Sequence, residues 1–185
     1  GLFVTRILAS DDVYTVWIAA RGSTHIGASG LVYGIVADGD SLMIAGSSLG
    51  GLVSVYAAMR HPDTYGCAAG LSSTLGWGSM SGDVSGRTVI EMWPGHLGSA
   101  IYIDSGGGAD AGCADTDGDG VNDDTSDADN YCVTLQLRDR LVSLGYESNV
   151  DVFYVFDPGG GHNEAAWRFR FPNALEACTT GGWTA

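Results

Sequence analysis

The sequence contains no lysine, so arginine supplies all eight of its basic side chains, against 22 acidic ones. The resulting formal net charge of −14 at pH 7 argues against a polyanionic partner, because nucleic acids and anionic membranes attract positive charge. Long apolar runs are missing as well, and none reaches the length needed to cross a bilayer. We therefore expect no nucleic acid partner and no membrane span.

The chain also lacks a signal-peptide pattern at its start, an internal repeat and an interdomain linker. Its 185 residues, 45% of them hydrophobic, predict one domain over residues 1–185 with a substantial core. The abrupt opening GLFVTRILAS is typical of a mature or clipped terminus. Residues 1–40 give weak signals, so we expect an atypical or incomplete N-terminal part, with a missing segment or another chain completing the sheet.

The four cysteines form no CxxC pair and have no zinc-like spacing with the histidines. Two disulfides are the favoured interpretation, which places the protein in an oxidising, secreted or periplasmic compartment. Three connectivities are possible. We prefer Cys113–Cys132, because this bridge would close the base of an acidic loop, and it leaves Cys67–Cys178 as the second bridge.

Short apolar runs alternate with helix-like stretches along the chain. Strands are predicted at 13–20, 41–45, 65–73, 99–106 and at the start of 150–162, and helices at 49–60, 133–145 and around 164–177. Buried strands alternating with helices predict an α/β protein with a parallel sheet covered on both faces. In such sheets the functional groups gather at the carboxyl ends of the strands.

The first of these strand ends carries a G-x-S-x-G pattern, with Ser48 at its centre and glycines at 46 and 50. Glycines two residues before and after a nucleophile permit a sharp strand-to-helix turn that exposes its hydroxyl. The backbone N–H of Leu49 would then supply one donor of an oxyanion hole. Ser48 is therefore the candidate nucleophile, and a structural glycine turn is the alternative.

A serine nucleophile requires a base and a carboxylate that orients the base. His162 is the candidate base, because among the four histidines only it follows a late strand directly, in the glycine-rich turn DPGGGH. The carboxylate should lie just past the strand at 99–106. Asp104 and Asp110 both satisfy this condition, and spacing alone does not separate them.

Eight aspartates and no basic residue fall between positions 110 and 129. The pattern D-x-D-x-D-G at 115–120 is the first half of a calcium loop, although position 12 of an EF-hand would be Ser126 and flanking helices are lacking. The segment 113–132 resembles the calcium loops of thrombospondin type 3 repeats. We expect it to bind a structural Ca²⁺ and no organic cofactor, the alternative being a solvated acidic loop. The candidate ligands are Asp115, Asp117, Asp119, Val121, Asp123 and Asp127.

Three stretches together resemble the esterase-D-like branch of the α/β-hydrolases, which includes feruloyl and enterochelin-type esterases: AGSSLGGLVSVYAAMRHPDTYGCAAGLSS, IYIDSGGGAD and GGGHNEAAW. The resemblance implies an α/β-hydrolase-like fold and a triad of Ser48, Asp110 and His162. It also implies a secreted serine esterase that forms an acyl-enzyme, with acyl transfer as a variant. The substrate would be a polysaccharide-linked, siderophore or lipid ester.

Two features depart from the family pattern. Only 47 residues precede Ser48, whereas the family has several strands and the second oxyanion donor in this part of the chain. The loop at 20–27 is a candidate for that donor. The acidic insertion is the other departure. A non-catalytic, calcium-stabilised structural or binding protein on a hydrolase fold is therefore the alternative function. Trp77 and Trp167 are candidates for lining a substrate pocket, with core packing as the alternative for each.

Overall fold

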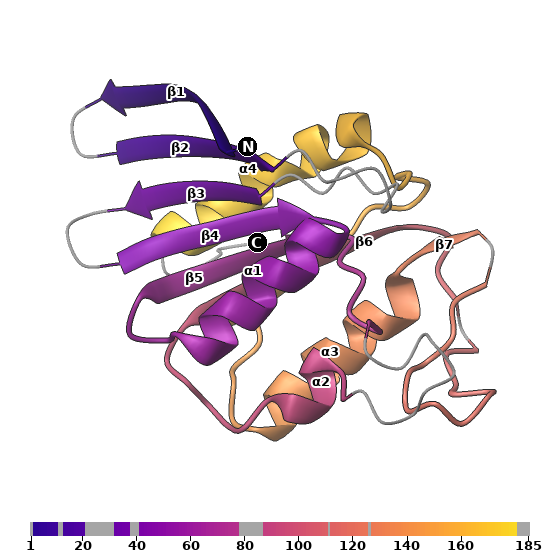
Figure 1. Ribbon diagram of the computed structural model, residues 1–185. Coiled ribbons are helices and arrows are strands. Elements are labelled where there is room, and N and C mark those ends of the chain that lie inside the picture. The colour runs from indigo at the N-terminus through magenta and orange to yellow at the C-terminus, as the bar shows by residue number, and fades with distance from the viewer. Residues whose placement is uncertain are drawn as a thin grey trace.

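The computed structural model describes residues 2–10, 13–20, 32–37, 41–77, 87–110, 112–125 and 127–180. Its strands are β1 (Leu2–Ser10), β2 (Val13–Ala20), β3 (Val32–Ala37), β4 (Ser41–Ser47), β5 (Tyr65–Leu71), β6 (Ala100–Gly107), β7 (Ala128–Asp129) and β8 (Val152–Phe156). Its helices are α1 (Leu49–Arg60), α2 (Val89–Met92), α3 (Tyr131–Ser143) and α4 (Glu164–Thr180) (Figure 1).

The sheet has two halves with different strand directions. From β4 through β5 and β6 to β8 neighbouring strands are parallel, whereas β1, β2, β3 and β4 pair antiparallel to one another. The two-residue β7 pairs antiparallel with the end of β6. The parallel half matches the predicted α/β-hydrolase-like class. The antiparallel strands β1–β3 lie within residues 1–40, the segment expected to be atypical or incomplete.

Alternating side chains of the parallel strands enter two separate cores. Ile44, Ala68 and Ile101 point to the face covered by α1, α2 and α3, where they meet Val55, Val89 and Leu137. Their neighbours Met43, Ala69 and Tyr102 point to the opposite face and meet Trp167, Ala174 and Ala177 of α4. Figure 1 shows α1 in front of the sheet and α4 behind it. Burial on both faces explains why these strands read as continuous apolar runs.

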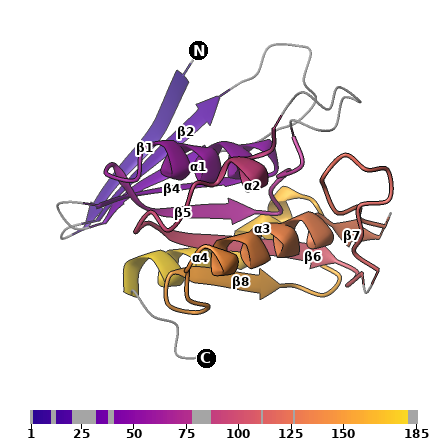
Figure 2. The ribbon, with the colours of Figure 1, turned by 90° about the horizontal axis from the view of Figure 1, so that it is seen from below.

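Both predicted disulfides are present. Cys67–Cys178 links β5 to α4, and Cys113–Cys132 closes the acidic loop at the start of α3. Figure 2 shows this loop at the end of the sheet near β7, far from β1 and β2. None of the helices among the described residues is long and apolar enough to cross a membrane.

Candidate active site

Ser48 lies at the sharp turn between β4 and α1, with φ 55° and ψ −124°. A positive φ is strained for a non-glycine residue, and such strain is typical of a nucleophile elbow. The turn needs glycine at position 46, because a Cβ there would lie 2.4 Å from the backbone carbonyl carbon of Gly50. The G-x-S-x-G pattern is thus explained by the close approach of two backbone segments.

Backbone hydrogen bonds hold the elbow against the end of β5. The N–H of Ser48 donates to the carbonyl of Leu71 (2.9 Å), and the N–H of Thr74 donates to the carbonyl of Ser48 (3.2 Å). The hydroxyl of Thr74 lies 3.4 Å from Ser48 Oγ. The Ser48 side chain is therefore fixed at the carboxyl edge of the sheet, where functional groups of α/β proteins gather.

His162 reaches Ser48 from the loop between β8 and α4, as predicted. Its Nε2 lies 2.9 Å from Ser48 Oγ. The glycine turn before it is docked on the end of β6, where the N–H of Gly107 donates to the carbonyl of Gly160 (2.6 Å). The imidazole is 43% exposed, so it can exchange protons with a substrate or with water.

Asp129 is the carboxylate that faces His162, with Oδ1 2.5 Å from His162 Nδ1. The prediction that Asp110 lies against this histidine is therefore wrong. Asp110 instead accepts hydrogen bonds from the N–H groups of Gly112 (2.8 Å) and Thr125 (3.2 Å) within the acidic loop. The loop lies between β6 and α3, and its last residues form β7, which brings Asp129 back to the sheet edge.

One sequence signal could have indicated Asp129. It stands just before the helix that begins at Tyr131, and most of the acidic insertion precedes it. The insertion therefore lies between the strand and the carboxylate, whereas the choice of Asp110 assumed that it lies after the carboxylate. The other candidate, Asp104, is fully buried inside β6 and does not contact His162; it accepts a hydrogen bond from the N–H of Ser72 (2.9 Å).

The environment of Asp129 favours its ionised form. Burial acts to raise its pKa, but the hydrogen bonds from His162 and Ser72 and the charges of His162 and Arg170 hold the pKa below the usual aspartate value. An ionised carboxylate only accepts hydrogen bonds, so the proton between it and the imidazole belongs to His162 Nδ1. In the neutral imidazole, Nε2 then accepts the hydrogen bond from the Ser48 hydroxyl.

Leu49, the predicted oxyanion donor, is the first residue of α1. Its N–H is one of the first N–H groups of a helix, which have no intrahelical acceptor. The positive end of the helix dipole reinforces it as a donor to a developing negative charge. The other candidate donor segment, residues 21–27, lies outside the described residues.

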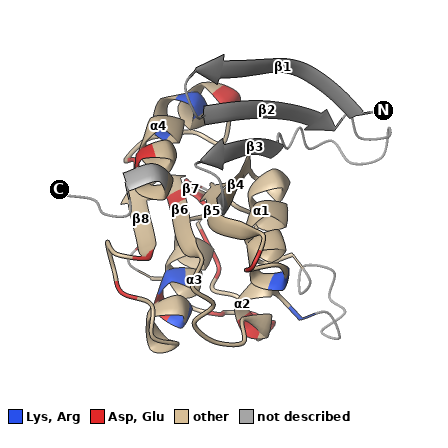
Figure 3. Cartoon of the chain, turned by 90° about the vertical axis from the view of Figure 1, so that its left-hand side faces the viewer, with Lys and Arg blue, Asp and Glu red and all other residues tan. Residues whose placement is uncertain are grey.

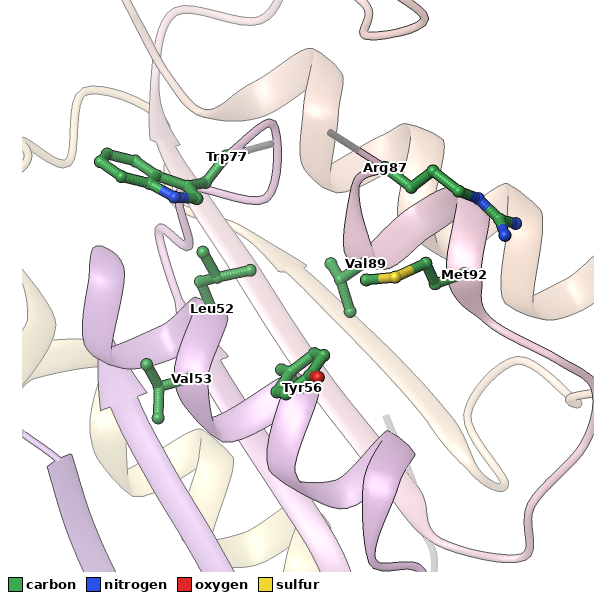
Figure 4. Close-up of a pocket in the computed structure, with 7 residues that line it drawn as sticks. All are labelled: Leu52, Val53, Tyr56, Trp77, Arg87, Val89 and Met92. Atoms are coloured by element: carbon green, nitrogen blue, oxygen red, sulfur yellow. The ribbon is translucent and has the colours of Figure 1, made fainter. Parts of the chain in front are cut away.

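An apolar pocket of about 330 Å³ lies between α1, the turn at Trp77 and α2. It is lined by Leu52, Val53, Tyr56, Trp77, Arg87, Val89 and Met92. Figure 4 shows that the Arg87 guanidinium points away from the other six side chains. Two of the pocket residues are hydrogen-bonded to the elbow or to its neighbour. The N–H of Leu52 donates to the carbonyl of Ser48, and the N–H of Trp77 donates to the carbonyl of Thr74, which itself contacts Ser48.

The two candidate pocket tryptophans have different environments. Trp77 lines the apolar pocket and is 53% exposed. Trp167 is buried and does not line this pocket. Its ring packs edge-on against His162, with 4.9 Å between the ring centroids, and so limits the movement of the imidazole.

The candidate calcium ligands divide into two groups. Carboxylate oxygens of Asp115, Asp117 and Asp123 lie within 4.8 Å of one another on the exposed loop. Asp119 Oδ1 accepts from the N–H of Val121 (2.8 Å). The Val121 side chain packs near Gly76, and Asp127 uses its carbonyl to accept from Gly108. Those last three residues are not part of the carboxylate cluster.

Comparisons with known proteins identify the family. The chain is similar to the enterochelin esterase of Shigella flexneri, at 20% identity and a TM-score of 0.51, and to the ferric enterobactin esterase of Salmonella typhimurium, at 20% identity and 0.48. Each likeness covers 72% of this chain and 29% of the other, so the chain spans less than a third of their length. No match was found among curated proteins. The family described as "Putative esterase" matches residues 33–178. The chain therefore belongs to this esterase family.

Proposed function

We propose that this chain is a serine carboxylic-ester hydrolase whose triad is Ser48, His162 and Asp129. The observation that carries the proposal is the continuous relay from Ser48 Oγ to His162 Nε2 (2.9 Å) and from His162 Nδ1 to Asp129 Oδ1 (2.5 Å). A nucleophile, a base and an orienting carboxylate within hydrogen-bond distance constitute the machinery of acyl transfer. Membership of the esterase family supports the same reaction.

In the proposed mechanism, Ser48 Oγ attacks the ester carbonyl while His162 Nε2 takes the hydroxyl proton. The Leu49 N–H at the start of α1 donates to the oxygen that becomes negatively charged. The tetrahedral intermediate collapses, the C–O bond to the alcohol breaks, and His162 returns the proton to the leaving oxygen. Water, deprotonated by the same imidazole, then hydrolyses the acyl-Ser48 ester and restores the free enzyme.

The apolar pocket beside the elbow supports an ester with an apolar acyl or alcohol group. It has room for a short acyl chain or a single aromatic ring, and among the described residues that line it only Arg87 is charged. We propose that such a group occupies the pocket while the rest of the ester remains outside. Polysaccharide-linked, siderophore and lipid esters all satisfy this description, and transfer to a sugar hydroxyl in place of water uses the same machinery.

Labelling with a fluorophosphonate tests the proposal directly. We expect the native protein to be modified at Ser48 with a stoichiometry near one, and we expect prior denaturation or the Ser48→Ala variant to abolish the modification. The same variant should lose hydrolysis of p-nitrophenyl butyrate. Unlabelled Ser48 in folded protein would contradict the hydrolase proposal and favour the non-catalytic alternative.

We propose separately that the acidic loop takes a calcium ion. The grouping of three carboxylates at 115, 117 and 123 supports this, because calcium prefers oxygen ligands and several carboxylates. The cluster is exposed and lies on the loop that delivers Asp129, so the ion would stabilise the loop and take no part in the ester chemistry. An extracytoplasmic location, secreted or periplasmic, is likewise a proposal, supported by the two disulfides.

A further inference from the structure

The second oxygen of the Asp129 carboxylate has its own set of partners. Oδ1 faces His162, whereas Oδ2 accepts a hydrogen bond from Ser72 Oγ (2.5 Å) and another from Arg170 Nη2 (3.3 Å). Ser72 Oγ also accepts a hydrogen bond from Arg170 Nη2. The carboxylate is thus held at both ends, by the imidazole on one side and by a serine–arginine pair on the other.

Arg170 is an unusual group to find at this depth, because its side chain is only 1% exposed. Besides Asp129 it faces Asp104 (Nε to Oδ1, 3.3 Å) and Asp157 (Nη1 to Oδ2, 3.6 Å). A buried guanidinium requires such partners, since an isolated buried charge is strongly destabilising. Figure 3 marks the arginines of α4, where Arg170 lies, in blue.

Two glycines make room for this guanidinium. A Cβ at Gly106 would lie 2.5 Å from Arg170 Nη1, and a Cβ at Gly160 would lie 2.9 Å from the same atom. Gly106 belongs to the end of β6 and Gly160 to the turn that precedes His162. The guanidinium therefore sits between the strand that pairs with β7 and the loop that carries the histidine.

Asp129 needs such a clamp because its own element is weak. β7 has two residues, paired with Gly106 and Gly107, and the acidic loop precedes it. Ser72 follows β5 directly and its N–H is anchored on Asp104, whereas Arg170 is fixed in the second turn of α4. Both partners of Oδ2 therefore come from well-supported parts of the fold.

We infer that Arg170 and Ser72 are positioning residues for Asp129, which fix Oδ2 so that Oδ1 meets His162 Nδ1. The inference rests on the proposed function only for its consequence in catalysis. Neither residue touches the nucleophile or the pocket. Their effect is therefore on the orientation of the imidazole, and a misplacement of about 1 Å in a catalytic group can cost about 100-fold in rate.

The test compares Arg170→Gln and Ser72→Ala with Arg168→Gln, which removes an exposed arginine from the same helix. Two quantities are measured: kcat and KM for p-nitrophenyl butyrate, and the downfield ¹H NMR signal of His162 Nδ1–H in protein with ¹⁵N-labelled histidine. For Arg170→Gln and Ser72→Ala we expect kcat to fall about 10- to 100-fold at similar KM, and the proton signal to move upfield or vanish. Arg168→Gln should match the wild type in both.

Folding is checked by near-UV circular dichroism, and Ser72→Ala, which removes no charge, decides the question if Arg170→Gln does not fold. An unchanged His162 proton signal in a folded variant would overturn the inference. If the wild type hydrolyses no ester but the signal responds as expected, the proposed function fails while the positioning role stands, because the NMR measurement does not depend on turnover.

Discussion

At the scale of single residues, the chemistry depends on which carboxylates are ionised and what they face. Asp129 lies against His162, and its pKa is held low despite its burial. Asp104, on the strand beside it, has the opposite behaviour, because burial raises its pKa to about 7 even though the Arg170 charge and the Ser72 N–H act to lower it. Two aspartates that share one arginine therefore have pKa values shifted in opposite directions.

Replacing Asp129 by asparagine should lower kcat by about 10⁴-fold, because an amide in this place favours the wrong histidine tautomer. Asp110→Asn is the matched control, since Asp110 contacts the loop backbone and not the imidazole. We expect the control to keep most of its activity in p-nitrophenyl butyrate hydrolysis. The opposite order of the two variants would restore Asp110 as the catalytic acid.

Asp104→Asn should change how stability depends on pH. Because the folded-state pKa of Asp104 is raised, folded protein holds this proton more tightly than unfolded protein does. The stabilisation that protonated Asp104 gives the folded protein is complete below about pH 4 and is lost as the pH rises to about 7. The free energy of unfolding of the wild type, relative to the variant, should fall by about 1.4 kcal/mol per pH unit in this window. Urea titrations at several pH values measure it, and a constant difference would contradict the raised pKa.

At the scale of elements, two neighbours of the elbow are expected to act on different steps. The pocket between α1 and α2 is the proposed site for the apolar group of the ester, and the acidic loop carries Asp129 at its end. The loop contacts α3 and the turn before Trp77: the N–H of Asn122 donates to the side-chain oxygen of Gln136 (2.9 Å), and Val121 lies against Gly76. Changes in the pocket should show in how activity depends on the length of the acyl chain, and changes in the loop should show in how stability depends on calcium.

Trp77→Ala should reduce kcat/KM for p-nitrophenyl hexanoate by about 10-fold, which corresponds to ~1.4 kcal/mol, and should affect the acetate ester much less. The reason is that only the longer acyl chain reaches the apolar wall. Phe169→Ala is the control, because Phe169 is an exposed aromatic residue that does not line the pocket. An equal loss of kcat/KM on the hexanoate and the acetate ester would show that the acyl group does not bind in this pocket.

Calcium should raise the melting temperature if the acidic loop binds it. At a free calcium concentration about 100-fold above Kd, binding to the folded state alone adds about 2.7 kcal/mol. We expect chelation to remove this gain and Asp115→Asn with Asp117→Asn to prevent it. Asp63→Asn, an exposed aspartate outside the loop, should keep it. Identical melting curves in calcium and in chelator would leave the loop a solvated acidic segment.

At the scale of the whole molecule, the fold is a sheet with helices packed on both faces. The apolar cores on the two faces are separate, and α4 alone covers one of them among the described residues. Cys67–Cys178 links that helix covalently to β5, across the second core. Since α4 also carries Arg170, loss of this helix would disconnect the clamp on Asp129.

Removing Cys67–Cys178 by alanine substitution of both cysteines should therefore destabilise the protein more than the same change at Cys113–Cys132. The bridges close loops with sequence separations of 111 and 19, for which the chain-entropy relation gives about 5 and about 3 kcal/mol. Urea unfolding under non-reducing conditions gives the comparison. The reverse order would show that the loop bridge has the larger structural role.

Several features could be read directly from local sequence. The helix predicted at 49–60 agrees with α1, the strand at 13–20 agrees with β2, and both disulfides have the predicted connectivity. The elbow at Ser48 was also recognisable. Each of these depends on neighbouring residues, such as the glycines at 46 and 50, or on a small set of possible pairings.

Only the tertiary structure decided which carboxylate faces His162. His162 meets Ser48 from 114 positions away and Asp129 from 33, and no local periodicity encodes such distances. Asp110 lies just before the acidic segment 113–132 and Asp129 lies near its end, and the pairing of β7 with β6 brings Asp129 to the histidine. The burial of Arg170 could likewise not be predicted from the sequence, because α4 carries one exposed arginine, Arg168, and one buried arginine, Arg170. The sequence determined the candidate nucleophile and its candidate base, whereas the folding of the acidic loop onto the sheet edge brings Asp129 to His162 and to the buried Arg170.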